Sequence, residues 1–386
     1  MTNNNSSDFA IKAKQFIKTL PYKEQPFSGR NWGHSWHSLC SYHGKLKPAI
    51  AHFLVKEFTN KGDVVLDPLG GVGTIPLEAC LQGRIGISND LSEMAYVVSK
   101  AKVEKPDIET VYEVINVLDD YINNNCNTSR TDRLIAQYSD FGYNGKLPDY
   151  FHEDTFREIV CARDYFVPRI QDLTPSEAMV FACFLHVLHG NRPYALSRIS
   201  HPLTPYAPRG DFEYKNVCKH IRDKVKLSYR KDDFEDYVQG KSLYGDYAQI
   251  TSKERNFADV IICSPPFANS IRFYMQNWMR LWLCGWEKDD YKNAETKFLD
   301  KKQDKNFDVY KSFFEMCNLA LKENGKIILH LGKTQKVDMA EELSSRAAPF
   351  FKEIYRGGED VQSVEKHGIK DKGGTIEHQY LFLEKN

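Results

Sequence analysis

The sequence predicts an α/β fold in which a doubly wound parallel sheet carries an inserted, mainly helical domain. Two apolar runs, 64–66 and 260–262, have the composition of buried strands, and each leads directly into a loop rich in Gly or Pro. After the first run, strand and helix patterns alternate, which is typical of a parallel sheet. Because the alternation stops near residue 106 and resumes near 240, we divide the chain into residues 1–105, an insert at 106–240 and residues 241–386.

The elements before the insert follow from hydrophobic periodicity. Residues 1 to about 30 have the composition of a loose polar tail followed by a short amphipathic stretch. Apolar residues at helical spacing predict a helix over 48–58, where Pro48 falls in the first turn and its missing N–H is tolerated. We then expect a strand at 63–67, a helix at 75–81, a strand at 84–88 and a helix at 94–103.

The insert has a helical pattern, and the sheet resumes beyond it. The segment 287–308 mixes acidic residues with lysines and has few apolar groups, so we expect a mobile, solvated loop there. In chain order, the other expected elements are helices at 110–123, 176–189 and 214–229, a strand ending near Asp246, a strand at 259–263, a helix at 307–322 and strands at 326–331 and 379–383.

Charge and cysteine content narrow the class of protein. The formal net charge of the 386 residues is zero, but the segment from His186 to Lys231 holds ten Lys or Arg against three acidic residues, so one region is strongly basic. The nine cysteines occur singly and without metal-binding spacing, and we therefore expect reduced thiols and no metal site. No stretch has the features of a signal peptide or a membrane span, which favours a cytoplasmic protein without a membrane partner.

Two loops at strand ends are the candidate functional motifs. The first, Asp-Pro-Leu-Gly-Gly-Val-Gly-Thr at 67–74, suits a nucleoside cofactor, because glycine lets the backbone approach a ligand and the next helix directs its positive end toward it. It matches neither a Walker loop nor the dinucleotide fingerprint. The second, Ser-Pro-Pro-Phe at 264–267, offers a hydroxyl, two rigid prolines and an aromatic ring that suit a flat polar ring. Either loop alone is also compatible with an ordinary turn.

Together these motifs resemble the amino-group DNA methyltransferases that use S-adenosylmethionine, the cytosine-N4 and adenine-N6 family. The stretch 67–74 is similar to the family's cofactor loop, although Leu69 stands where Phe is usual, and 264–267 is similar to its catalytic loop in the cytosine form. Tyr42-His43-Gly44-Lys45 with Pro48 resembles the segment that folds over the methionine end of the cofactor. The resemblance implies a class I methyltransferase-like sheet of seven strands with the last antiparallel, and a target-recognition lobe in the insert.

The resemblance also implies roles for individual residues. A carboxylate after the second strand binds the ribose hydroxyls, which is the role expected of Asp90. Asp67 is expected to face the ammonium of the cofactor, and Asp246 the adenine side. The expected cofactor-binding residues are Tyr42, Lys45, Asp67, Pro68, Gly70, Gly71, Gly73, Thr74, Asp90 and Asp246, and the expected catalytic residues are Ser264, Pro265, Pro266 and Phe267. The expected nucleic-acid-binding residues are Asn191, Arg192, Tyr194, Ser197, Arg198, His201, Arg272, Tyr274, Asn277 and Arg280.

The expected activity is sequence-specific transfer of a methyl group to the N4 amino group of cytosine in double-stranded DNA. The alternatives are N6-adenine methylation, RNA guanine methylation, and a catalytically silent DNA-binding scaffold with the same fold. A restriction or defence-system protein is an expected partner. Cys263 is expected to pack inside its strand, because a cysteine nucleophile for ring-carbon methylation requires a Pro-Cys loop of its own.

Overall fold

One mixed sheet of seven strands organises the computed structural model, which describes residues 2–29, 32–42, 44–191, 193–201, 204–231, 233–252, 254–268, 273–361 and 374–386, with side chains from residue 8 onward. The strand order is β3-β2-β1-β4-β5-β7-β6, and only β7 runs antiparallel to its neighbours. The strands are β1 Val64–Asp67, β2 Ile85–Asp90, β3 Lys241–Tyr244, β4 Ala258–Cys263, β5 Leu321–Thr334, β6 Phe351–Asp360 and β7 Thr375–Lys385.

Helices cover both faces of the sheet, as a doubly wound fold requires. The chain passes from β1 outward through β2 to β3 and later from β4 to β5 on the other side, so right-handed crossovers place the two sets of helices on opposite faces. Alternate strand residues divide accordingly: Val65 faces one core cluster and Leu66 the other. One face carries α1 Thr2–Thr19, α2 Pro48–Phe58, α3 Thr74–Leu81 and α4 Glu93–Val103, and the other carries α14 Tyr310–Ala320 and α15 Met339–Ala347.

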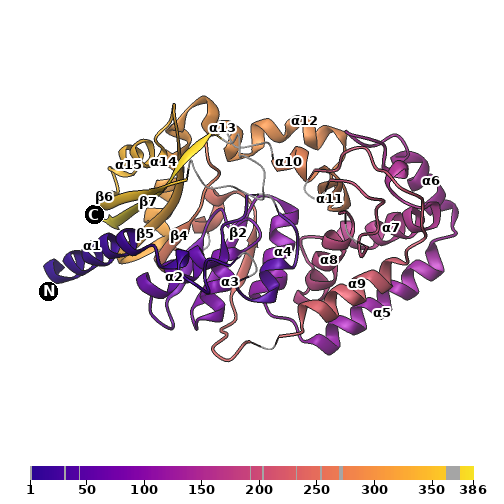
Figure 1. Ribbon diagram of the computed structural model, residues 1–386, viewed down its shortest axis with the longest axis horizontal. Helices are drawn as coiled ribbons and strands as arrows, with labels where there is room; N and C mark the ends of the chain where they lie inside the picture. Colours follow the sequence, from indigo (N-terminus) through magenta and orange to yellow (C-terminus); the bar gives the residue numbers. More distant parts are fainter. Residues whose placement is uncertain are drawn as a thin grey trace.

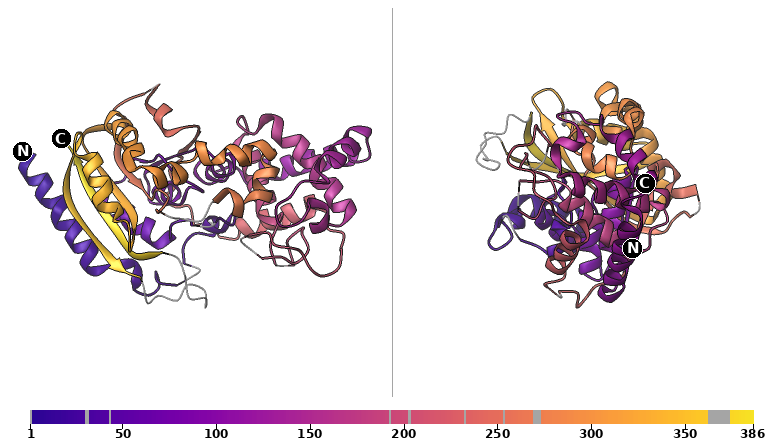
Figure 2. Two further views of the ribbon diagram at one scale, coloured as in Figure 1. Left: turned by 90° about the horizontal axis from the view of Figure 1, so that it is seen from above. Right: turned by 90° about the vertical axis from the view of Figure 1, so that its right-hand side faces the viewer.

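The insert folds as a helical lobe beside the sheet (Figure 1, Figure 2). Its helices are α5 Ile108–Asn125, α6 Ser129–Tyr138, α7 Glu153–Phe166, α8 Pro175–Val187 and α9 Val217–Ser228. Helix α8 is buried on all sides and packs on α4, which joins the lobe to the sheet. Three further helices pack into the hydrophobic core of this lobe, although they follow β4 in the chain: α10 Phe273–Gln276, α11 Trp278–Leu283 and α12 Lys288–Lys297.

Two expectations about loops are wrong. The N-terminal tail contains the 18-residue helix α1, because Phe9, Ala13 and Phe16 form an apolar stripe that is buried against the sheet layer. The segment 287–308 contains α12 and the short helix α13 Leu299–Lys305 instead of a solvated loop. Its charged residues cover the outside, while a few buried side chains such as Leu299 attach it to the core.

Most of the other helices and strands expected from the sequence are found within a few residues of their expected bounds. Strand β6 was not expected, because its alternating polar residues lie at the sheet edge and its pairing with β7 is a long-range contact. Helices α6, α7 and α15 were likewise missed. The 3-10 helices are η1 Pro21–Lys23, η2 Ser35–Ser38, η3 Leu147–Tyr150, η4 Val167–Arg169, η5 Tyr247–Ser252 and η6 Phe307–Val309.

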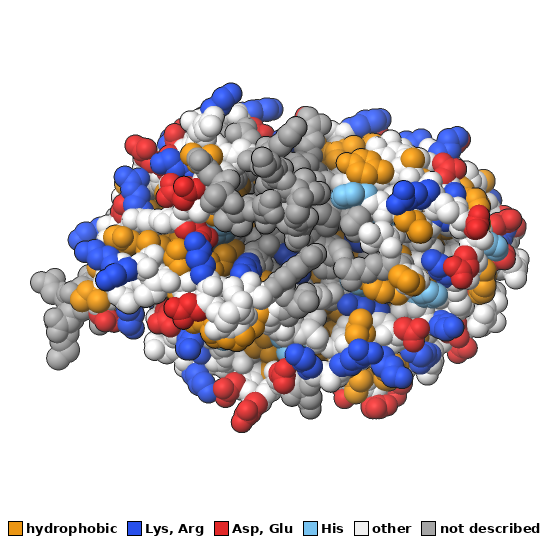
Figure 3. Space-filling view, viewed as in Figure 1, with side chains coloured by type: hydrophobic (Ala, Val, Ile, Leu, Met, Phe, Trp, Pro, Cys, Tyr) orange, Lys and Arg blue, Asp and Glu red, His pale blue; other side chains and the backbone are white. Residues whose placement is uncertain are grey.

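The surface carries mixed charge. On the face drawn in Figure 3, blue Lys and Arg side chains are interspersed with red Asp and Glu, in keeping with the net charge of zero. Among the helices of the described residues, none has the length and apolar character needed to cross a lipid bilayer.

Candidate functional site

The two predicted loops meet at the edge of the sheet where the carboxyl ends of the parallel strands lie. Strand β1 pairs in parallel with β4, with Leu66 opposite Ile261, so the glycine loop at 67–74 and the proline loop at 264–267 leave neighbouring strands in the same direction. The thiol of Cys263 hydrogen-bonds the carboxylate of Asp67. Strand order reverses between β1 and β4, and open α/β sheets bind ligands at such a switch point.

The glycine loop is shaped by close contacts that exclude side chains. A Cβ at Gly70 would lie 2.2 Å from the Ser88 hydroxyl of β2, so only glycine fits there. Gly73 caps α3 with a positive φ of 69°, a conformation that glycine adopts without strain. On the side of the loop that faces α4, the fully buried Lys102 donates a hydrogen bond of 2.5 Å to the carbonyl of Val72. Neighbouring elements thus hold the loop in place before any ligand binds.

Two carboxylates line this edge. Asp90 at the end of β2 accepts hydrogen bonds from the amides of Gly71 (2.9 Å) and Ser92 (2.8 Å), which ties the second strand to the glycine loop. Burial raises the pKa of Asp90 to about 6. Burial also raises the pKa of Asp67 to about 7, although hydrogen bonds from Cys263 and the Leu69 amide favour its charged form. Both acids therefore favour a positively charged ligand, since a nearby cation stabilises their ionised form.

Tyr42 covers the glycine loop. Its ring lies 3.8 Å from the position that a Cβ of Gly71 would take, and burial raises the pKa of its phenol, with the nearby carboxylate of Asp90 adding to the shift. The ammonium of Lys45 donates to the carbonyl of His37 (2.6 Å), and burial lowers its pKa. Tyr42 thus lies against the glycine loop, whereas Lys45 supports the segment around His37.

The proline loop is held at two points. The Ser264 hydroxyl lies 3.1 Å from Nδ1 of His330 on β5, and burial lowers the pKa of His330 to about 3, so the imidazole is neutral. On the other side, the amide of Gln303 on α13 donates to the carbonyls of Pro266 (3.0 Å) and Phe267 (3.2 Å). From the described residues, no hydrogen bond reaches the carbonyl of Pro265. The Ser264 hydroxyl and the Pro265 carbonyl therefore each retain a lone pair that can accept a hydrogen bond.

The ring of Phe267 packs on strands β5 and β7. A Cβ at Gly332 of β5 would lie 2.5 Å from the Phe267 ring, so this ring requires glycine beneath it. The ring also contacts His330 and His378, with centroids 5.4 Å and 5.8 Å away, and remains half-buried. Its orientation is thus determined by β5 and β7.

The arrangement of the sheet and its ligand-binding edge identifies the fold. Strands β1 to β5 are parallel, the order reverses between β1 and β4, and β7 is inserted antiparallel between β5 and β6. The protein has a class I methyltransferase fold. The predicted sheet of seven strands with the last antiparallel is therefore confirmed.

Comparison with known proteins agrees with this fold. A family model described as "RMKL-like, methyltransferase domain" matches residues 36–131, which include Tyr42, the glycine loop and Asp90. Type II methyltransferase M.MjaII of Methanocaldococcus jannaschii is 18% identical over 326 residues, which cover 62% of this chain and 61% of the relative. The chain thus spans less than two thirds of that relative. Both matches are to methyltransferases.

Solved structures give only distant similarity. The rRNA methyltransferase aviRa from Streptomyces viridochromogenes is 9% identical with a TM-score of 0.36, covering 94% of each chain. A TehB-like SAM-dependent methyltransferase from Corynebacterium glutamicum is 9% identical with a TM-score of 0.32, covering all of both chains. M. jannaschii TYW2, in complex with AdoMet, is 9% identical with a TM-score of 0.31, covering 93% of this chain and 80% of that chain.

The other predicted cofactor residues also follow the carboxyl ends of strands, but Asp246 differs in its hydrogen bonding. Pro68 accepts a hydrogen bond from the Asn89 side chain (3.2 Å), and the buried Thr74 begins α3. Asp246, in contrast, accepts from the amide of Ala248 (3.0 Å) and so caps η5 beyond β3. This placement corresponds to a turn residue, and it does not by itself indicate a contact with adenine.

The nucleic-acid residues of the insert divide into exposed and structural ones. Asn191 and His201 are exposed and line a surface hollow of about 490 Å³ together with Arg209. Arg198 instead stacks on Phe212 at 4.2 Å and donates to the carbonyls of Asp149 and Gly210. Tyr194 stacks on His186, and Ser197 is buried beside His189. Arg192, and Arg272 after the proline loop, lie outside the described residues.

Three predicted contacts after the proline loop need correction, because their side chains are buried in the helical lobe. Arg280 is 1% exposed, and its guanidinium donates to the carbonyls of Leu185 and His189 at the end of α8. Asn277 donates to the Phe273 carbonyl, and Tyr274 is buried with its hydroxyl directed at Glu295. A buried arginine paired with carbonyls stabilises the packing of α11 on α8 and has no access to DNA phosphates in this conformation.

Sequence reasoning missed the residues that support the two loops. His330 lies in an apolar strand, and a polar residue at a buried position was a usable signal. Lys102 occupies an inward position of an apolar helix, which was a similar signal. Gln303 lies in a segment of mixed charge and gave none.

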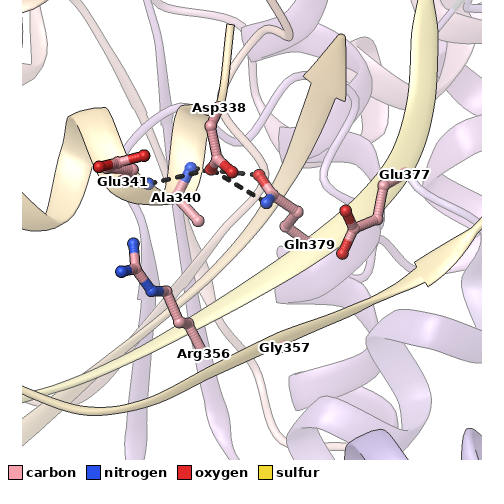
Figure 4. A pocket seen from close by; sticks show the side chains of 7 residues that line it. All are labelled: Asp338, Ala340, Glu341, Arg356, Gly357, Glu377 and Gln379. Carbon is pink, nitrogen blue, oxygen red and sulfur yellow. Dashed lines mark hydrogen bonds between the residues drawn. The ribbon is translucent and has the colours of Figure 1, made fainter. Parts of the chain in front are cut away.

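A second hollow, of about 200 Å³, lies between α15 and strands β6 and β7 (Figure 4). Three of its polar groups are linked to one another: Gln379 donates to Asp338 (3.0 Å), and the amide of Ala340 donates to Gln379 (3.2 Å). These pairs join α15 to the sheet, and the hollow shares no residue with the two loops.

Proposed function

We propose that the protein is a sequence-specific DNA methyltransferase that moves a methyl group from S-adenosylmethionine to the N4 amino group of cytosine. The observation that carries this proposal is the pair of acceptors at the proline loop, the Ser264 hydroxyl and the Pro265 carbonyl, next to the glycine loop. An exocyclic amine has two N–H donors, and two fixed acceptors match them. The acidic edge formed by Asp67 and Asp90 fits a cofactor that carries a sulfonium and an ammonium.

Bound S-adenosylmethionine would supply the methyl group: the amine nitrogen would form the new N–C bond, the electron pair of the broken S–C bond would stay on sulfur, and the amine would release one proton to solvent water. The residues of this chain prepare the amine. With the proton of neutral His330 on Nε2, the Ser264 hydroxyl donates to Nδ1 and its oxygen lone pairs accept one amine N–H. The Pro265 carbonyl accepts the other, which localises the nitrogen lone pair and directs it toward the methyl group.

Rigidity of the loop contributes to the rate. Two consecutive prolines and the hydrogen bonds from Gln303 hold the acceptors in place before the substrate arrives, and preorganised dipoles are the main electrostatic source of catalysis. Holding nitrogen and methyl in near-attack geometry lowers a barrier by roughly 7 to 11 kcal/mol in intramolecular reference reactions. No covalent intermediate is required.

The base must leave the duplex to reach this edge. Flipping costs a few kcal/mol, and in this proposal Phe267 contacts the base once it has entered the cleft. The exposed residues Asn191, His201 and Arg209 of the insert support a target-recognition surface, because amide, imidazole and guanidinium groups read base edges and phosphates. Double-stranded DNA, a restriction or defence-system partner and a cytoplasmic location belong to this proposal.

The test is to incubate the protein with plasmid DNA and tritiated S-adenosylmethionine, digest the DNA and identify the labelled nucleoside by mass spectrometry. We expect N4-methylcytosine. A label on adenine would replace cytosine by the N6-adenine alternative, and a label found only in RNA would overturn the DNA substrate. Binding of DNA without any transfer would identify a silent scaffold. As a control, S264A and P265A should each reduce transfer, and turnover unchanged in both would refute the mechanism.

A further inference from the structure

Asp300, on α13, is a buried carboxylate without a partner. Its residue is 6% exposed, and neither Oδ1 nor Oδ2 has a hydrogen bond from the described residues. An unpaired carboxylate is costly to bury, and the usual response is a neutral carboxyl group or a bound cation. Burial accordingly raises the pKa of Asp300. The position therefore has acceptors available for a ligand.

Contacts on either side place Asp300 at the site. Next to it in the chain, Phe298 packs on Phe273 (4.8 Å between centroids), and Phe273 lies 6.4 Å from the ring of Tyr42. The carboxylate of Asp300 also acts on the phenol of Tyr42, whose pKa is raised by burial, by Asp90 and by Asp300. Asp300 is thus near the residue that covers the glycine loop.

The next turn of α13 contacts the proline loop. Gln303 lies one turn after Asp300, and its amide donates to the carbonyls of Pro266 and Phe267. Helix α13 is therefore situated between the cover of the glycine loop and the catalytic loop. The methionine part of a cofactor bound at the glycine loop must extend into this region for its methyl group to reach Ser264 and Pro265.

We propose that Asp300 binds the α-ammonium group of S-adenosylmethionine, an inference that rests on the proposed function. The two carboxylates next to the glycine loop already accept hydrogen bonds: Asp67 from the Leu69 amide, and Asp90 from two backbone amides. Asp300 has both oxygens available. An ammonium group has three N–H donors and a full charge, so it satisfies the carboxylate and offsets the cost of its burial.

Calorimetric titration of the full-length protein with S-adenosylhomocysteine tests this inference, because that ligand has the ammonium but no transferable methyl group. Asp300 is changed to asparagine (D300N), and D289N on α12 is the matched control, since the exposed Asp289 pairs with Lys292. We expect D300N to bind about 10- to 100-fold more weakly, the loss typical of a charge-assisted hydrogen bond. D289N should bind as the wild type does.

Two further titrations make the result specific. 5′-Methylthioadenosine lacks the amino-acid part, and D300N should bind it as well as the wild type. An S-adenosylhomocysteine analogue with hydrogen in place of the α-amino group should bind weakly to the wild type, and this comparison needs no variant. Equal loss of both ligands by D300N, or unchanged binding of S-adenosylhomocysteine, would overturn the assignment. Unchanged binding with slower transfer would indicate a contact with the target amine. A wild type that binds no adenosyl ligand would refute the proposed function.

Discussion

Replacing Gln303 by leucine separates positioning of the catalytic loop from cofactor binding. The buried amide of Gln303 donates to the carbonyls of Pro266 and Phe267, at 3.0 Å and 3.2 Å, and its oxygen accepts from the hydroxyl of Tyr310 at 2.8 Å. Leucine has a similar volume and none of these polar groups. The Q303L variant therefore leaves two carbonyls and one hydroxyl without a partner.

The expected magnitude follows from those three groups. An orphaned buried group costs about 1 to 3 kcal/mol, so the three groups left by Q303L should lower the unfolding free energy by at least about 3 kcal/mol. A misplacement of about 1 Å in a reactive group reduces the rate by about a hundredfold. We therefore expect kcat to fall by about 10- to 100-fold. The Kd for S-adenosylhomocysteine should change by less than about twofold, because Gln303 contacts the catalytic loop and not the glycine loop.

The assay combines single-turnover methyl transfer to DNA, calorimetric titration with S-adenosylhomocysteine, and urea unfolding. Y310F removes only the hydroxyl that holds Gln303 and should show a smaller loss in the same direction. Q137L provides the matched control, because Gln137 is exposed on α6. A Q303L enzyme with wild-type kcat, or one whose cofactor affinity falls as much as kcat, would refute the positioning role.

Other predictions concern packing and pH. G332A should push a Cβ to within 2.5 Å of the Phe267 ring, costing about 1 to 3 kcal/mol of stability and slowing transfer while cofactor titrations stay unchanged. Affinity for S-adenosylmethionine should rise between pH 5 and pH 8, because burial raises the pKa of Asp67 to about 7 and that of Asp90 to about 6, and the sulfonium charge favours their ionised forms; titrations with no pH dependence would contradict this. Hydrogen bonds from two histidines outweigh burial and lower the pKa of Glu78 to about 2, so its stabilisation should be lost as pH falls from about 4.5 toward 2, and urea unfolding of E78Q should show a shallower slope there.

The succession of the main strands and helices along the chain was predictable, because each of them depends on a local pattern. The runs at 64–66 and 260–262 are long enough and apolar enough to be strands without reference to the rest of the chain. The loops after them contain residues with strong backbone preferences, so their position at the strand ends followed directly. Strand β6 and helix α1 were not predictable in this way, because one depends on edge pairing and the other on burial against a distant surface.

The sequence alone determined the two loops, the glycine positions and the carboxylates at the strand ends, because each of these features can be recognised within a short stretch of the chain. Only the tertiary structure decided that Arg280 is buried in the helical lobe, that Gln303 supports the proline loop, and that Asp300 is left unpaired beside Tyr42. The physical reason is that burial and hydrogen-bond partners are properties of neighbours in space. In a segment of mixed charge such as 287–308, composition does not reveal which few side chains face the site.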